Sequence, residues 1–230
     1  MRMSEECLIC SSPLVYQERA DIMECSICHK KEESRTKCSQ GHYVCNECHM
    51  AGLDSIMKVC LKSSSANPFE VLGEMMLLPF CHMHGPEHHV MTGAALLTAY
   101  RNAGGNIDLA DSLAEMISRG KEVPGGSCGY WGACGAGIST GIFVSIITGG
   151  DPLSVEPFRL AHLMTAKALH DIGIIGGARC CKRDAFLAVS AAVDFVRENF
   201  GVDMLKSDVV CKYFPRNNQC IGTRCPFRKS

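Results

Sequence analysis

Apolar side chains recur at steps of three and four residues through most of the chain after residue 67. This spacing places them on one face of an α-helix and predicts helices over residues 90–100, 132–147, 154–171 and 182–200, with further helices that begin near Pro68 and Asp108. Glycines at residues 104–105 and 120 stand where two of these helices should end. No alternation of strands with helices is visible, so we expect an all-α bundle.

The first sixty residues have a different pattern. Cysteines, charged residues and short polar connections dominate there, and the apolar residues show little periodicity. A segment this small buries too little surface to fold alone, so we expect bound metal to supply the missing stability. Residues 63–68 have the composition of a linker. The chain is therefore predicted to be mainly α, with a small treble-clef or cross-brace-like head over residues 1–62 and a helical domain over residues 68–230.

Charge and composition narrow the functional classes. The 230 residues carry 23 basic and 24 acidic side chains, which gives no general attraction to nucleic acid or to an anionic membrane. The longest apolar run, residues 138–148, is too short to span a bilayer. Residues 1–6 are polar and acidic where a secretory signal would be basic and then apolar. We therefore expect a cytoplasmic protein, in which closely paired cysteines are better explained as metal ligands than as disulfides.

The strongest chemical signal is a series of four closely spaced ligand pairs in the head. Two residues between cysteines let both sulfurs reach one tetrahedral ion from a tight turn, and zinc accepts mixed sulfur and imidazole ligands. Eight ligands make two closed four-coordinate sites without an open position, so we expect two structural zinc ions. The pairs are Cys7 with Cys10, Cys25 with Cys28, Cys38 with His42, and Cys45 with Cys48.

Residues 25–48 resemble the first three ligand pairs of a RING-type cross-brace, with the pair at positions 7 and 10 in place of the usual last one. Cross-brace pairing predicts one site from Cys25, Cys28, Cys45 and Cys48, and a second from Cys7, Cys10, Cys38 and His42. Two zinc ribbons in sequence are the competing arrangement. His49 and Cys60 lie outside the pairs, and we expect them to be exposed or packing residues.

A dense group of histidines lies just before the predicted helix at residues 90–100. Pro86 suits the first turn of a helix, and Gly85 suits the turn before it. Neutral imidazoles are good ligands for iron, zinc or nickel, and one of them, His88, is also a candidate for acid–base catalysis. The alternative is a polar, partly exposed loop. The candidate metal ligands in this segment are His82, His84, His88 and His89.

A glycine-rich segment at residues 125–137 contains two cysteines, Cys128 and Cys134. Glycines allow close approach of the backbone and expose N–H groups that can bond to cluster sulfides. At the start of the next helix, the positive end of the helix should lower the pKa of Cys134, which makes it a candidate ligand or catalytic nucleophile. We expect Tyr130 and Trp131 to pack over this loop. Tight helix packing through small residues is the alternative.

This segment resembles a known family. Residues 90–104, the run Cys128-Gly-x-x-Gly-Ala-Cys134-Gly-Ala-Gly and the pair Cys180-Cys181 are similar to the redox-active family named for its C…GCAxxG…C…C pattern. The resemblance implies a helical domain with cysteines placed for redox or cluster chemistry, although His88 or His89 stands where that family has its first cysteine. The layout of head and helices is also similar to an uncharacterised domain family of anaerobic archaea and bacteria.

The tail adds three more cysteines, Cys211, Cys220 and Cys225, the last followed by a proline. A cysteine before proline, with irregular spacing upstream, is typical of iron–sulfur ligation. With Cys180 or Cys181 as the fourth ligand, the tail can hold a [4Fe–4S] cluster. Two alternatives stay open: Cys128, Cys134 and an imidazole hold one ion while the tail holds another, or the tail binds no metal.

Three functional hypotheses follow. The first is an iron–sulfur protein of anaerobic metabolism whose centre serves redox or Lewis-acid chemistry on an unidentified small molecule, with a redox partner. The second is a non-catalytic adaptor whose zinc head binds a partner protein; few basic residues cluster on the head, which disfavours nucleic acid. The third is a thiol-based accessory factor for methyl or sulfur transfer, with Cys134 as the reactive thiolate.

Overall fold

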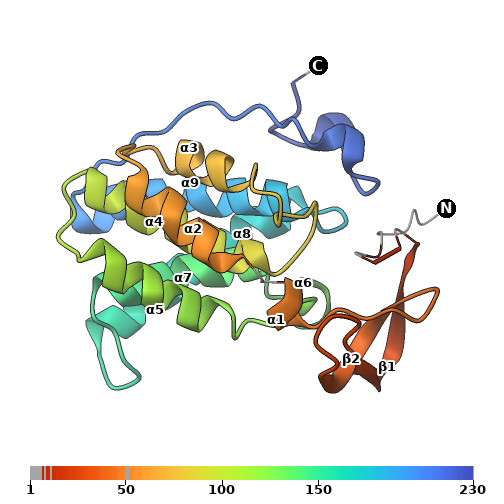
Figure 1. Ribbon diagram of the computed structural model, residues 1–230. Helices are drawn as coiled ribbons and strands as arrows, with labels where there is room; N and C mark the ends of the chain where they lie inside the picture. Colours follow the sequence, from red (N-terminus) through yellow and green to blue (C-terminus); the bar gives the residue numbers. More distant parts are fainter. Residues whose placement is uncertain (1–6, 8, 11, 50–51, 230) are drawn as a thin grey trace.

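The computed structural model describes residue 7, residues 9–10, residues 12–49 and residues 52–229. It shows a small β-hairpin head beside a larger bundle of helices, with a long C-terminal segment running over the bundle (Figure 1). The predicted fold class, mainly α with a small cysteine-rich head, is confirmed.

The head is built on two antiparallel strands that the sequence pattern did not reveal. β1 (Leu14–Glu24) pairs with β2 (Lys31–Cys38), from Leu14 opposite Cys38 to Glu24 opposite Lys31, with an irregularity between Tyr16 and Asp21. Most of β1 is exposed, so apolar alternation is weak and the usual signal of a strand is missing. The short helix α1 (Asn46–His49) follows β2. This hairpin carries the cysteine pairs on its turn and at its ends.

The helical body surrounds one central helix, α4 (Glu87–Asn102), which is buried on nearly all sides. Small residues such as Gly93, Ala94 and Ala95 let its neighbours approach closely. A helix that is buried all round lies at the centre of its bundle. The helices that contact α4 are α2 (Leu53–Lys62), α3 (Pro68–Met75), α5 (Leu109–Gly120), α7 (Gly135–Ile147) and α9 (Cys181–Phe200).

Most predicted helices occur where the periodicity placed them. The Asn67 side chain accepts a hydrogen bond from the Phe69 N–H at 3.0 Å, and Asp108 accepts one from the Asp111 N–H at 2.9 Å, so both helices are N-capped next to their predicted starts. α8 (Glu156–Ile175) packs on α7 and α9, and the short α6 (Ser127–Tyr130) lies in the glycine-rich loop. Helix α2, whose Ile56 and Cys60 are buried in the core of the bundle, has no counterpart among the predicted helices.

The C-terminal segment, residues 201–229, contains only two short 3₁₀ turns, Phe214–Arg216 and Gly222–Arg224. It is held against the body by backbone bonds, such as Leu205 N–H to the Ala66 carbonyl at 2.9 Å. The ring of Phe227 also packs on Phe186 of α9, with centroids 5.3 Å apart. The tail is thus a fixed part of the body, which places its cysteines. Among the described residues, no helix is long and apolar enough to cross a membrane.

Gly141→Ala should destabilise the protein by about 1–3 kcal/mol, as overpacking of a core does. A Cβ at Gly141 would overlap the Thr165 hydroxyl and lie 3.0 Å from the backbone oxygen of Ala161 in α8. The measurement is the thermal midpoint of unfolding, which should fall by several degrees, at roughly 2–4 °C per kcal/mol.

Gly73→Ala is the matched control for that prediction. Gly73 also lies in a helix, α3, but a Cβ there would meet nothing within 4 Å. The higher helix propensity of alanine should then leave the midpoint unchanged or raise it slightly. Equal destabilisation by the two substitutions would contradict the close α7–α8 packing.

Candidate metal centres

Cys25 and Cys28, in the turn between β1 and β2, lie next to Cys45 and Cys48, which follow β2. The four sulfurs are all within 4.8 Å of one another. The Cys28 and Cys45 sulfurs are 3.5 Å apart, which is much longer than a disulfide bond. The distance is close to the separation of about 3.8 Å expected between two sulfurs that each lie about 2.3 Å from a tetrahedral ion. The Cys25 sulfur accepts N–H bonds from Ile27 and Cys45. Burial opposes ionisation, but the backbone N–H groups of Cys28, Cys45 and Ile27 outweigh it and lower the Cys25 pKa to about 6.

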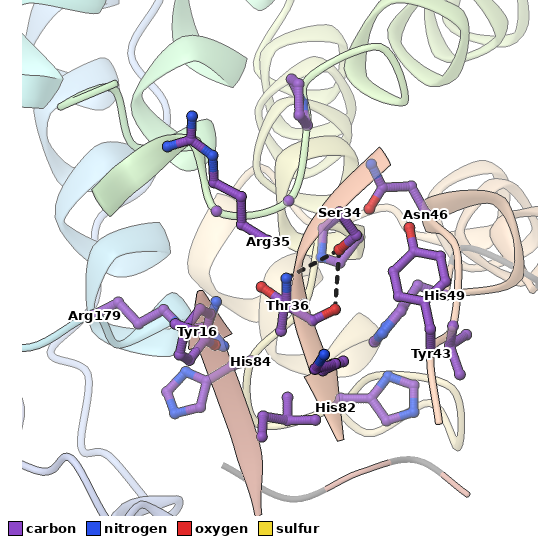
Figure 2. A pocket seen from close by; sticks show the side chains of 18 of the residues that line it. Tyr16, Ser34, Arg35, Thr36, Tyr43, Asn46, His49, His82, His84 and Arg179 are labelled. Carbon is purple, nitrogen blue, oxygen red and sulfur yellow. Dashed lines mark hydrogen bonds between the residues drawn. The ribbon is translucent and has the colours of Figure 1, made fainter. Parts of the chain in front are cut away.

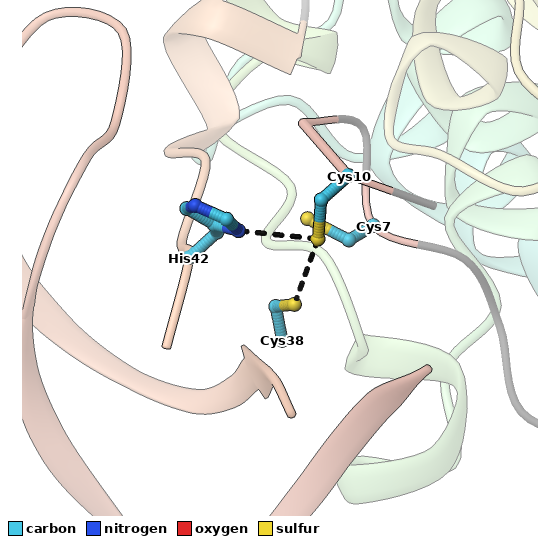
Figure 3. Close-up of side chains that lie close together, drawn as sticks. All are labelled: Cys7, Cys10, Cys38 and His42. Carbon is cyan, nitrogen blue, oxygen red and sulfur yellow. Dashed lines mark hydrogen bonds between the residues drawn. The ribbon is translucent and has the colours of Figure 1, made fainter. Parts of the chain in front are cut away.

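The second group joins Cys7, Cys10, Cys38 and His42 at the other end of the hairpin (Figure 3). The Cys10 sulfur lies 3.5 Å from that of Cys38 and 3.2 Å from Nδ1 of His42. Hydrogen bonds from Ser12, more than any other contact, lower the pKa of Cys10 to about 6. Three sulfurs and one imidazole nitrogen converging in this way suit a tetrahedral divalent ion.

The two groups interleave along the chain, because the first and third ligand pairs form one group and the second and fourth form the other. The structure therefore brings the eight residues together as the cross-brace pairing groups them, and not as two ribbons in sequence would. All eight cysteines and histidines converge in sets that can hold metal ions. That the ion is zinc stays a prediction.

A third group lies where the head meets the body. One ligand atom each of His49, His82 and Glu87 lies within 4.8 Å of the other two. The imidazole rings of His49 and His82 pack edge to face with centroids 5.6 Å apart. The Glu87 carboxylate is completely buried at the start of α4, and its Oε1 accepts the backbone N–H of His82 at 2.9 Å. Burial opposes ionisation of Glu87, but the nearby imidazoles of His82 and His88 lower its pKa to about 2.

Cys81 and His88 lie on the other side of Glu87. The Cys81 sulfur is 3.9 Å from Nε2 of His88 and accepts a hydrogen bond from Lys182 Nζ at 3.0 Å. Lys182 is itself buried at the start of α9 and stacks over the ring of Tyr213. Burial lowers the pKa of His88 to about 3, so this imidazole is neutral at physiological pH. The group is an ammonium–thiol pair next to a neutral histidine.

The histidines of residues 82–89 therefore face different surroundings. Nε2 of His84 lies 3.3 Å from Oδ1 of Asn217 in the tail, and Nδ1 of His88 lies 3.0 Å from the Gly85 carbonyl. Nδ1 of His89 lies 3.0 Å from the Val123 carbonyl, and its ring packs on Gly135. Of the four candidates, His82 and His88 belong to candidate metal groups, whereas His84 and His89 do not belong to the groups found among the described residues.

Cys134 is the N-cap of α7, as expected, but the predicted lowering of its pKa is wrong. Burial and the neighbouring carboxylate of Asp184, 3.9 Å from the sulfur, outweigh the backbone N–H groups and raise the pKa to about 12. Cys128 and Cys181 lie close enough to Cys134 to interact with it electrostatically. The predicted packing of Tyr130 and Trp131 over this loop is also wrong, because the two residues are 41% and 66% exposed.

The tail covers a separate small pocket of about 10 Å³, and four cysteines are among its lining residues. Asn217 donates a hydrogen bond to the Cys180 sulfur at 3.3 Å, and Tyr213 N–H donates to the Cys211 sulfur at 3.4 Å. Burial raises the pKa of Cys180 to about 11. These four thiols are not among the described sets whose ligand atoms all lie within 4.8 Å, so they are not spaced for one ion. The four cysteines are Cys180, Cys211, Cys220 and Cys225.

A cleft of about 870 Å³ separates the head from the body. Its walls come from β1, β2, the loop after β2, residues 82–86 and residues 124–127, with His49 and His82 close together on one side (Figure 2). Arg35 and Arg179 project from opposite sides. A cavity of this size is large enough for a small-molecule ligand. The group of His49, His82 and Glu87 therefore borders the cleft. The pocket lined by Cys180, Cys211, Cys220 and Cys225 lies on the other side of residues 81–86, where Met83 lines both.

Residues 56–228 match a protein family described as a family of unknown function (DUF5714), and the chain belongs to this family. Comparison with curated proteins and with solved structures finds no match. The matched segment includes residues 81–89, the glycine-rich loop and the cysteines of the tail, but it begins after the eight head ligands. What the family shares is thus the helical body. The resemblance to the redox-active family stays a prediction.

Cys45→Ser should remove one metal ion per chain, because it deletes a fully buried ligand of the group at Cys25. X-ray absorption at the edge of the ion that remains should show three sulfurs and one nitrogen, the ligands of the group at His42. His42→Cys is the control: a fourth thiolate should keep both ions. A remaining ion with four sulfurs in Cys45→Ser would favour the ribbon pairing.

Proposed function

We propose that this protein is an iron–sulfur redox protein, with a [4Fe–4S] cluster held by Cys180, Cys211, Cys220 and Cys225. The two ligand groups of the head hold structural zinc. The cluster exchanges single electrons with a partner protein and serves a small-molecule reaction in the cleft. One observation carries the proposal: four thiols from the start of α9 and from three positions in the tail line one small pocket, whose walls would move apart to admit the cluster.

The spacing of these thiols favours a cluster over a single ion. A [4Fe–4S] cluster takes one cysteine on each iron, so its ligands stand farther apart than the ligands of a mononuclear site. The thiols at positions 180, 211, 220 and 225 share a cavity without converging within 4.8 Å. The irregular spacing and the proline after Cys225 fit the same assignment.

The surroundings of the cavity suit an anionic cluster. Arg183 and Arg228 contribute to its wall; Arg183 is paired with Asp184, so Arg228 supplies the positive charge that offsets the negative charge of thiolates and cluster. The amide of Asn217 and the N–H of Tyr213 donate to two of the sulfurs, and such bonds raise the reduction potential of a cluster. Phe214 and Ile221 add apolar side chains to the same wall.

Four cysteine ligands leave no iron open to substrate, so electron transfer is favoured over Lewis-acid chemistry. The cluster lies under the tail, where Cys211 and Cys220 are partly exposed, and electrons can pass to a partner over a short distance. The alternative of a thiol-transfer factor loses support because burial raises the pKa of Cys134 to about 12.

Protein purified without oxygen should be brown and contain about four iron and four sulfide per chain, as one [4Fe–4S] cluster requires. Cys220→Ala should remove most of the iron, the sulfide and the visible absorbance, because it deletes one of the four ligands. Iron, sulfide and zinc are measured on the same sample, and zinc should stay at the wild-type level because the head is unchanged.

The matched control is Cys128→Ala, a partly exposed thiol of the body that lies outside the cavity wall. It should leave iron and colour at the wild-type level. If Cys128→Ala abolishes the colour while Cys220→Ala keeps it, the cluster sits at the glycine-rich loop and the assignment to the tail is wrong. A colourless wild-type protein, reconstituted with iron and sulfide and still free of cluster, would reject the proposal altogether.

A further inference from the structure

The buried carboxylate at the start of α4 lacks the partners that a buried charge requires. Glu87 is fully buried, and within the described part of the chain its Oε2 atom has no hydrogen-bond partner. Buried polar atoms are nearly always bonded, and an unbalanced buried charge is costly. The nearby Lys182 does not resolve this, because its ammonium bonds to the Cys81 sulfur.

Two further unsatisfied atoms lie beside this carboxylate. Nδ1 of His49 and Nδ1 of His82 are also buried and, among the described residues, have no hydrogen-bond partner. Nδ1 of His82 lies 3.7 Å from Oε1 of Glu87, too far for a hydrogen bond. Two imidazoles and one carboxylate thus converge, with their ligand atoms within 4.8 Å, at one place. One cation between them would satisfy all three side chains.

The backbone holds the carboxylate in this position. Glu87 folds back over Gly85, and a Cβ at that residue would overlap the carboxylate oxygens. The N–H of His82 binds Oε1 from the other end of the same turn. The loop therefore fixes both the glutamate and the histidine, while the zinc head supplies His49 directly after the ligand Cys48.

We propose that His49, His82 and Glu87 hold a divalent transition-metal ion, Zn²⁺ or Fe²⁺, with its remaining coordination positions open to the cleft. Two histidines and one carboxylate are the ligands of catalytic zinc sites and of mononuclear iron oxygenase sites, which keep positions open for water or substrate. His49 and His82 line the cleft, whereas Glu87 closes the site from behind. The saturated ligand groups of the head offer no such position.

The adjoining group of Cys81, Glu87 and His88 is the weaker candidate for this ion. Its sulfur is 3.0 Å from the ammonium of Lys182, and that cation would repel a metal ion bound at the same atom. Nδ1 of His88 already lies 3.0 Å from the carbonyl oxygen of Gly85. The ion therefore belongs on the cleft side of Glu87.

The test uses Co²⁺ added to the full-length protein that has been loaded with two zinc ions per chain, the number that the head holds, so that the proposed third site stays free. One Co²⁺ per chain should bind in addition to the zinc, and X-ray absorption at the cobalt edge should show nitrogen and oxygen ligands only. That measurement is specific for cobalt, so zinc and any cluster do not interfere. Cobalt surrounded by sulfur, or no cobalt beyond what displaces zinc, would overturn the proposal.

Two variants probe the ligands, each by the affinity for Co²⁺. His82→Ala and Glu87→Gln should each weaken binding by at least roughly tenfold, since each deletes or neutralises a ligand. His82 is partly exposed, so its replacement is tolerated by the fold, and added imidazole should restore part of the binding in that variant. The two zinc ions of the head and the iron–sulfur cluster of the tail should be retained in both.

His170→Ala is the matched control, because this histidine lies exposed on α8 away from the cleft. Its Co²⁺ affinity should equal that of the wild type. Equal affinity in His82→Ala and Glu87→Gln would remove these residues from the site. The outcome is independent of the iron–sulfur proposal, since cobalt binding at the cleft requires none of the tail cysteines and loss of iron alone would leave it intact.

Discussion

Helices α4, α7 and α9 begin at the same end of the body, and the chemistry of the protein depends on this arrangement. Gly135, the first residue of α7, packs on the His89 ring in the first turn of α4. The Asp184 carboxylate of α9 lies 3.9 Å from the sulfur of Cys134, the N-cap of α7. Helix N-termini carry partial positive charge and unpaired N–H groups, which favour anions such as the Glu87 carboxylate, although burial outweighs this effect at Cys134. Both proposed metal centres of the body lie at this end.

The same arrangement explains why charged residues are buried there. Glu87, Lys182, Arg183 and Asp184 are each at most 4% exposed. Arg183 forms an ion pair with Asp184 at 2.9 Å, and Lys182 donates a hydrogen bond to the Cys81 sulfur. Both buried positive charges of this set therefore have a partner. Buried ions are retained only when paired or bound to metal, because desolvation costs several kcal/mol per ion. Glu87 is the exception within this set, which is why a cation belongs beside it.

The sequence predicted what depends on local spacing and missed what depends on tertiary contacts. The helices and the Asn67 and Asp108 caps follow from short-range patterns, and the eight head residues follow from ligand spacing. His49 was expected to be an exposed or packing residue, because a histidine outside the ligand pairs has no spacing signal. Glu87 was not predicted to be a ligand for the same reason. The pKa of Cys134 was misjudged because burial and Asp184, 50 residues away in the chain, outweigh the helix terminus. Strand β1 was missed because its two faces are both largely exposed.

Residues 81–86 connect the two proposed centres of the body. The Met83 side chain belongs to the wall of the cleft and also to the wall of the four-cysteine cavity. Nε2 of His84, on the cleft side, lies 3.3 Å from Oδ1 of Asn217, whose amide nitrogen in turn donates to the Cys180 sulfur at 3.3 Å. One loop and one asparagine therefore separate the proposed cluster from the cleft. A cluster with four cysteine ligands cannot bind substrate, and a mononuclear site with two histidines and a carboxylate cannot store electrons by itself if it holds zinc. If the proposed ion in the cleft is Fe²⁺, a proposed cluster on the other side of this loop is close enough to supply it with electrons, whereas a zinc ion there would not accept them.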